Sequence, residues 1–292
     1  MRIADNMRQA GVLRNIQDLT ARQAEATTRA QTGRFVNKPS DDPAAAAELA
    51  RIRASTAQTD TQLKAASTAR GDMELAEGVL AQAGDLFVKA HEIAMQGANG
   101  SLDGQTRASL SQEVAGLKQQ LVALANTQGT TGYLFGGSKT GTPPFSVTGT
   151  FSGDDVDHLV DLGGASPTSV GVSGAGAFTA AGGRDVFADL DALEGALNTN
   201  DQDVIASTLA NLETSRKQIV NVQASAGIKL DRLQTTEDIL GQAKLALAKR
   251  DEATAGTDPV KAYSDLVTLG QSLEQAVGVA KRILDLGELF RT

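Results

Sequence analysis

The sequence predicts a mainly α-helical fold, an elongated rod of long antiparallel coiled-coil helices that carries a small β-rich insertion. Three observations lead to this prediction. Apolar residues recur at spacings of three and four over two very long stretches of the 292-residue chain. Glycine and proline interrupt this pattern near both ends of the chain. A central segment changes to Gly, Ser, Thr and short β-branched runs, which are typical of hairpins and turns.

The first element is a helix from Ile3 to about Ala30, with a narrow apolar stripe that Gly33 ends. A final stripe begins after the break "GTDPVKAY" and runs to the C-terminus. Because the two ends of the chain mirror each other, we expect residues 1–34 and 258–292 to pair as antiparallel terminal helices in a coiled coil. The seam that we expect them to use in assembly consists of Ile3, Met7, Leu13, Ile16, Tyr263, Leu266, Leu273, Val277 and Leu284.

The turn after the first helix has the signature of a helix start. Ser40, Asp41 and Asp42 stand where an N-cap and first-turn carboxylates belong, and we take Ser40 and Asp41 as the capping groups. Pro43 suits the first helical position, and the four alanines that follow have the highest helix propensity.

Two long helices follow from the heptad spacing. The first, Pro43 to Gly97, would be about 80 Å long, and a shorter helix from Gly104 to Thr127 comes after it. In the second, apolar residues stand seven apart from Leu212 to Leu247. We expect residues 39–129 and 185–256 to form a core domain of long helices, and residues 130–184 to form the small β-rich outer insertion.

Composition excludes several function classes. The chain has no cysteine, and its two imidazoles, His91 and His158, stand in no catalytic or metal-binding motif. The cluster Asp154, Asp155, Asp157 and His158 lacks the spacing of a calcium loop. A net charge of -8 repels nucleic acid, and no apolar run reaches the ~20 residues of a membrane span. We therefore expect no enzyme activity, cofactor, metal, nucleic-acid partner or membrane association.

Four motifs along the chain resemble the flagellin family of bacterial axial proteins. They are "TGRFVNKPSDDPAAAAELARIR", "GYLFGGSKTGTPPF", "FSGDD" and "AYSDLVTLGQSLEQAVGVAKRILDLGELF". Within that family, the proline-framed Pro39 to Pro43 and the segment Tyr133 to Phe145 are more similar to proteins of the hook–filament junction than to filament flagellin. The resemblance covers essentially the whole length of the chain, and it implies a flagellin-like rod.

The resemblance implies a non-catalytic adaptor of the bacterial flagellum. Its subunits would form a ring of like subunits between a hook-associated junction protein on the hook side and flagellin on the filament side. An export chaperone and the flagellar type III apparatus would deliver it outside the cell without a cleaved signal peptide. Isolated amphipathic helices are marginal in water, so we expect the terminal segments to become ordered when neighbours bury their stripes.

Two alternatives stay open at this stage. The chain could be a filament-forming flagellin, which long filaments grown from purified protein would reveal. It could also be an unrelated coiled-coil sensor or scaffold, although such proteins normally carry a membrane span or a ligand domain. Since residues 130–184 contain turn residues but no reactive constellation, we expect that trimming residues 163–176 leaves assembly largely intact.

Overall fold

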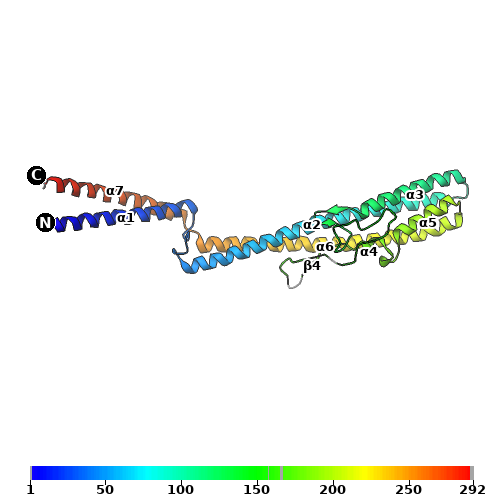
Figure 1. Ribbon diagram of the computed structural model, residues 1–292, viewed down its shortest axis with the longest axis horizontal. Helices are drawn as coiled ribbons and strands as arrows, with labels where there is room; N and C mark the ends of the chain where they lie inside the picture. Colours follow the sequence, from blue (N-terminus) through cyan, green and yellow to red (C-terminus); the bar gives the residue numbers. More distant parts are fainter. Residues whose placement is uncertain (1, 157, 165–166, 290–292) are drawn as a thin grey trace. The chain divides into compact units, whose positions relative to one another are not determined.

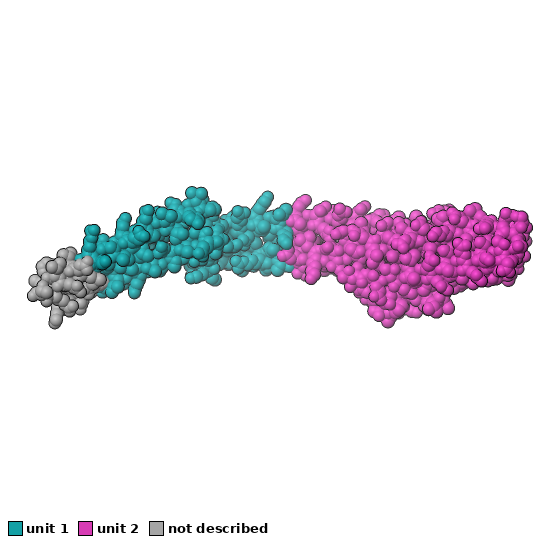
Figure 2. Space-filling view, turned by 90° about the horizontal axis from the view of Figure 1, so that it is seen from above, with its two compact units in different colours: residues 1–58, 243–292 teal, residues 59–242 magenta. Residues whose placement is uncertain are grey.

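The computed structural model describes residues 2–156, 158–164 and 167–289, with the backbone alone for 2–6, 8, 9 and 284–289. The chain divides into two compact units (Figure 2). One unit contains residues 1–58 and 243–292, and the other contains residues 59–242. Both divisions fall inside long helices, whereas the predicted domain limits fall at helix breaks, and those limits stay a prediction.

The first unit contains the terminal helices α1 (Arg2–Thr32) and α7 (Pro259–Leu289). It also contains one end of each long helix, α2 (Pro43–Gly97) and α6 (Gln202–Ala255). Helices α1 and α7 lie side by side, with the start of α1 and the end of α7 at the same end of the pair (Figure 1). The helix breaks predicted at Gly33 and Gly256 are confirmed, because glycine and proline stop both helical patterns there.

Helices α2 and α6 are antiparallel and pack through the heptads predicted for them. Within the second unit, Arg70 of α2 donates a 3.1 Å hydrogen bond to Glu237 of α6, and Gln223 donates to Glu77. The side chains buried at seven-residue intervals are Ala66, Met73, Leu80, Phe87 and Ala94 in α2, and Leu212, Ile219, Ala226, Leu233 and Leu240 in α6. Full burial of an apolar side chain of this size stabilises a fold by roughly 1.5–3 kcal/mol, so this seam supports the long helices.

Two shorter helices complete the helical part of the second unit. Helix α3 (Gly104–Ala125) begins at its N-cap Asp103, whose carboxylate accepts from Thr106 N, and α5 (Val186–Asn198) begins at its N-cap Asp185. They pack antiparallel, since Ser111 bonds Asn198 near one end and Lys118 pairs with Asp191 further along. The fold class is therefore confirmed as mainly helical, with long helices packed antiparallel.

The insertion contains two small antiparallel sheets and one short helix. Strands β1 (Gln128–Gly129) and β2 (Gly132–Tyr133) form one sheet, and β3 (Leu159–Val160) and β4 (Thr168–Ser169) form the other. Helix α4 (Gly174–Phe178) and the 3-10 turn η1 (Ala180–Gly182) follow them. The sequence predicted only hairpins and turns for these last segments, because glycine has a low helix propensity.

Tertiary contacts explain why this glycine-rich stretch becomes helical. A Cβ at Gly174 would lie 2.1 Å from the carbonyl oxygen of Phe135, so only glycine allows this close approach. Gln218 of α6 is buried, and its Nε2 donates to the carbonyl oxygens of Ala177, Thr179 and Arg184 at 3.0–3.1 Å. One amide side chain therefore fastens the end of the insertion to α6.

An aromatic cluster joins the insertion to the helices. Its ring centroids lie 5.0–6.3 Å apart, and its members are Phe135, Phe145, Phe151, Phe178 and Phe187. Phe187 belongs to α5, so the insertion and the helices share one core. Val170 and Val172 are buried in that same core. Trimming residues 163–176 would therefore remove buried side chains and lower the stability of the second unit, and the expectation that assembly stays largely intact remains a prediction.

A buried arginine connects the two helix-to-helix turns at one end of the second unit. Arg107 is 1% exposed, and its guanidinium donates to the carbonyl oxygens of Gly97, Leu102 and Asn99. It also donates to the side chain of Asn200, which has a φ of 59° in the turn between α5 and α6. A guanidinium suits this position because its planar fork can reach several acceptors at once.

We predict that Arg107→Ala lowers the free energy of unfolding by about 2–4 kcal/mol, because it leaves one buried and two partly buried carbonyl groups without their donor. Urea titration followed by circular dichroism measures the change. Arg216→Ala is the matched control, since Arg216 pairs with Glu213 on the surface of one helix and should cost less than about 1 kcal/mol. Equal effects of the two substitutions would contradict the connecting role of Arg107.

Candidate functional site

The contact between α1 and α7 is a regular heptad seam. Side chains that are at least partly buried recur at alternating spacings of four and three on both helices. They are Val12, Ile16, Leu19, Gln23, Ala26 and Ala30 in α1, and Ala262, Leu266, Leu269, Leu273, Ala276, Ala280 and Ile283 in α7. Ala26 and Ala262, near the turns, are the most deeply buried, at 8% and 6% exposed. The seam is thus narrow and, apart from Gln23, made of small or aliphatic side chains.

The residues that the sequence predicts for the assembly seam fall into three groups in the structure: in the α1–α7 contact, exposed, or outside the described side chains. Ile16, Leu266 and Leu273 lie in the contact between α1 and α7. Four other members are exposed: Met7, Leu13, Tyr263 and Val277. The side chains of Ile3 and Leu284 lie outside those that the structure describes. Burial of the exposed members by other subunits stays a prediction.

Helix α7 also carries an outward apolar face. Val260, Tyr263 and Val267 are 78%, 65% and 55% exposed, and their spacing of three and four places them on one side of the helix. This face differs from the α1 contact, which uses Ala262, Leu266 and the positions that follow in the same heptads. Exposed apolar side chains gathered on one face mark an interaction surface.

At the base of this helix pair, the chain segments after α1 and before α7 are bonded to each other. Arg34 and Gly256 form an antiparallel bridge. Phe35 N donates to Ala255 O at 2.6 Å, and Thr257 N donates to Gly33 O at 3.0 Å. Gly33 has a φ of 65°, which glycine adopts without strain.

An ion pair reinforces this bridge. The guanidinium of Arg34 donates two hydrogen bonds to the carboxylate of Asp251, at 2.7 and 3.0 Å. Both side chains are partly buried, 30% and 26% exposed, and the bidentate geometry is the strongest that these groups form. These hydrogen bonds lower the pKa of Asp251 below its usual range and raise the pKa of Arg34. We call the segments 33–35 and 251–257, joined by these bonds, the clasp.

The turn between the clasp and α2 contains the predicted helix-capping residues. Asp42 is the residue that caps α2, because its Oδ1 accepts from Ala44 N and Ala45 N at 3.0 Å. The assignment of capping to Ser40 and Asp41 was wrong. Asp41 instead closes the preceding loop by accepting from Asn37 N and Lys38 N, and these two bonds lower its pKa.

The positions next to Asp42 complete this turn. Ser40 is exposed, and Pro43 is the first residue of α2, as the sequence predicts. Two adjacent aspartates thus have separate roles, one for the loop and one for the helix. Sequence reasoning missed this division because a carboxylate suits both positions.

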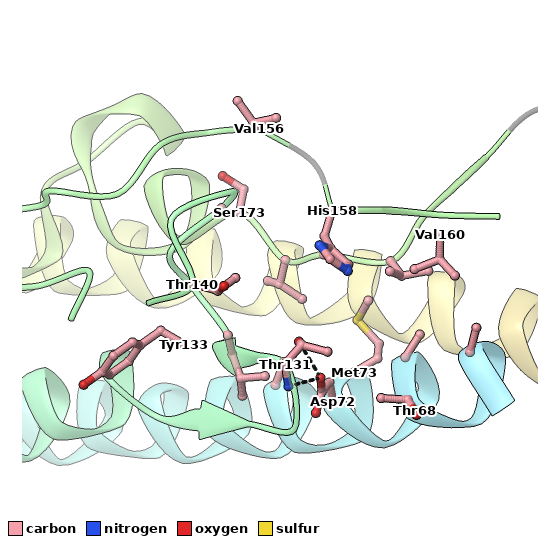
Figure 3. Close-up of a pocket in the computed structure, with 18 of the residues that line it drawn as sticks. Thr68, Asp72, Met73, Thr131, Tyr133, Thr140, Val156, His158, Val160 and Ser173 are labelled. Carbon is pink, nitrogen blue, oxygen red and sulfur yellow. Dashed lines mark hydrogen bonds between the residues drawn. The ribbon is translucent and has the colours of Figure 1, made fainter. Parts of the chain in front are cut away.

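The second unit contains a cavity of about 400 Å³ between α2 and the insertion (Figure 3). Its walls are mostly apolar, with Met73 on α2, Val160 in β3 and Val172 after β4. The acids at its edge accept hydrogen bonds from the insertion itself. Asp72 accepts from Thr130 N and from both donors of Thr131.

Asp154 and Asp155, the described acids of the cluster near His158, also accept hydrogen bonds from the insertion. Asp154 accepts from the backbone and hydroxyl of Ser138, which lowers its pKa, and Asp155 accepts from the Ser173 hydroxyl. Asp157 lies outside the described residues. Within the described ranges, no group of three or more His, Cys, Asp or Glu side chains is placed to hold a metal ion. Within the same ranges, no helix is long and apolar enough to span a membrane.

Comparisons with known proteins agree with this architecture. Residues 3–140 match the model of the bacterial flagellin N-terminal helical region. The chain is 28% identical to flagellar hook-associated protein 3 of Salmonella typhimurium and of Escherichia coli, over 82% of this chain and 83% of those proteins. Residues 3–140 thus match the flagellin family, and the chain as a whole is similar to flagellar hook-associated protein 3.

Solved structures of flagellin-family proteins share its fold. A flagellar hook-associated protein from Vibrio parahaemolyticus superposes with a TM-score of 0.68 at 19% identity, covering 74% of this chain and 100% of that one. The flagellar junction protein FlgL from Legionella pneumophila gives a TM-score of 0.57 at 17% identity, covering 73% and 100%. The fold of this chain is therefore the fold of these flagellar hook-associated and junction proteins.

We predict that Asp42→Ala destabilises the start of α2 by about 1 kcal/mol, because two backbone N–H groups lose their acceptor. Amide hydrogen exchange of the segment 43–50 and urea titration measure the loss. Ser40→Ala is the control and should leave both measurements unchanged. A larger loss of stability in Ser40→Ala than in Asp42→Ala would show that Ser40 is the cap.

A second prediction concerns pH and the clasp. Because Arg34 lowers the folded-state pKa of Asp251, the contribution of Asp251 is complete above its ordinary pKa of about 3.9 and is lost as the pH falls through the lower folded value. Protection of the Phe35 and Thr257 amides should therefore stay constant from pH 7 to about pH 5 and decrease in stronger acid. Asp251→Asn should weaken this protection already at neutral pH. Identical protection in the variant and the parent at pH 7 would show that the ion pair does not support the bridge.

Proposed function

We propose that this chain is the structural adaptor that joins the hook side of the bacterial flagellum to its flagellin filament. One observation carries the proposal: the similarity to flagellar hook-associated protein 3 extends over 82% of this chain and 83% of that protein. The two proteins therefore correspond in length and order of segments, with the insertion included.

The exposed apolar face of α7 supports an assembly role. Val260, Tyr263 and Val267 are exposed although α7 already buries another face against α1. A helix with two apolar faces can hold its partner within the chain with one face and contact a neighbouring subunit with the other. An adaptor needs such surfaces on both sides, because it contacts like subunits and unlike ones.

We propose specific partners on this basis. Like subunits form a ring, a hook-associated junction protein binds on the hook side, and flagellin binds on the filament side. An export chaperone holds the chain before the flagellar type III apparatus delivers it outside the cell, without a cleaved signal peptide. In the assembled ring, residues 1–34 and 258–292 form the inner coiled coil, and the long helices form the next shell.

The experiment starts from a strain in which the gene for this chain is deleted. We expect cells that keep their hooks, lack filaments and release flagellin into the medium, as an absent junction requires. Electron microscopy of the cells and immunoblots of the medium measure both effects. Filament flagellin is the alternative function, and it predicts that purified chain elongates into long filaments and that deletion removes flagellin subunits from the medium.

Complementation tests the outward face of α7. The double variant Tyr263→Lys with Val267→Lys should fail to restore filaments, because it places charges where neighbouring subunits bury apolar side chains. Val147→Lys is the matched control, since Val147 is 90% exposed on the insertion and the same change there should restore filaments. Normal filaments with the α7 variant would exclude this face from assembly.

A further inference from the structure

The apolar seam between α1 and α7 does not select one register by itself. Apart from Gln23, its positions are Val, Ile, Leu and Ala, so a shift by one heptad again places mainly apolar side chains opposite one another. In coiled coils, polar groups at the seam or ion pairs beside it normally fix the register. Among the side chains that the structure describes, no hydrogen bond or ion pair joins α1 to α7.

The specific bonds are concentrated at the base of the pair, in the clasp. Two backbone hydrogen bonds and two side-chain hydrogen bonds connect Gly33, Arg34 and Phe35 with residues 251–257. A Cβ at Gly256 would lie 2.4 Å from the carbonyl oxygen of Glu252, so the bridge also needs glycine at this position. These bonds are directional, and none of them survives a displacement of several ångströms.

The segments that connect the clasp to α1 and α7 are too short to let either helix slide far along the other. Helix α1 ends at Thr32, next to Gly33, and α7 begins at Pro259, two residues after Thr257. Asp258 is itself fixed, because its carboxylate accepts from Val260 N at 2.8 Å in the first turn of α7. A heptad shift moves a helix by about 10 Å, whereas two extended residues span at most about 7 Å.

We propose that the clasp sets the register of α1 against α7. Arg34 and Asp251 act as positioning residues, and the seam supplies the less specific apolar attraction. With the clasp closed, one register is compatible with the short connections. With the clasp open, the helices can pair in shifted registers that differ little in apolar burial.

The absence of cysteine makes a cross-linking test possible in the full-length chain. The position of a Cβ at Gly270 lies 3.6 Å from Nε2 of Gln23, so these residues face each other across the seam. Chains with Gln23→Cys and Gly270→Cys report the native register. Chains with Gln23→Cys and Val277→Cys report a shift of one heptad. A short reagent that links two thiols, applied to dilute purified protein, gives the yield of each product by mass spectrometry.

In the parent chain, we expect the native pair to cross-link and the shifted pair to give little product. Arg34→Ala, Asp251→Ala and Gly256→Ala should each change the ratio of native to shifted product by roughly tenfold. The first two remove the ion pair of the clasp, and the third places a Cβ against the carbonyl oxygen of Glu252 and so distorts the bridge. The exchange of charges in Arg34→Asp with Asp251→Arg should restore part of the ratio. Arg250→Ala is the matched control, since it removes the neighbouring pair with Glu48 and should leave the ratio unchanged.

Three results would overturn the proposal. They are an unchanged ratio in the three clasp variants, equal yields of the two products in the parent, and no product at either pair in the parent. The last result would mean that the clasp cannot organise the helices in the isolated chain. Because the assay uses purified protein, its outcome is independent of the junction role, which the deletion strain tests separately.

Discussion

Burial at seven-residue intervals between α2 and α6 is the interaction on which the rest of this structure depends. Neither helix would be stable alone in water over its length, because helix propensity contributes little without packing. Side chains such as Leu80 and Ile219 are completely buried in this contact. The insertion connects α3 to α5, and both of these helices belong to the same unit as this contact. Buried residues of α3 and α5 join those of α2 and α6 in one core.

Polar side chains in the second unit hold loops in place. Arg107 connects two helix turns, Gln218 fastens the end of the insertion, and Asp72 binds the turn between β1 and β2. Arg107 and Gln218 satisfy backbone acceptors that are buried or partly buried, whereas Asp72 accepts from exposed donors of its turn. This use of polar groups suits the adaptor role that we propose, because an adaptor presents fixed surfaces to its neighbours.

The first unit uses a different balance of forces. Its terminal helices meet through a narrow apolar seam, and directional bonds are concentrated in the clasp between residues 33–35 and 251–257. A narrow seam leaves other faces of α7 free, and Tyr263 and Val267 stand on such a face. Because the contact between α1 and α7 is narrow, α7 keeps an exposed apolar face, which we propose neighbouring subunits bury.

The sequence alone determined the helices, their breaks and the heptads of α2 and α6, because periodicity and glycine or proline signals are local. Only the tertiary structure decided which aspartate caps α2, since Asp41 and Asp42 are equally suitable in sequence and differ in the backbone that they meet. It also decided that "GAGAF" is helical and that Arg34 meets Asp251. The choice of cap depends on the local path of the backbone around residues 37–45. The other two outcomes depend on contacts between residues far apart in the chain, and no local pattern encodes such contacts.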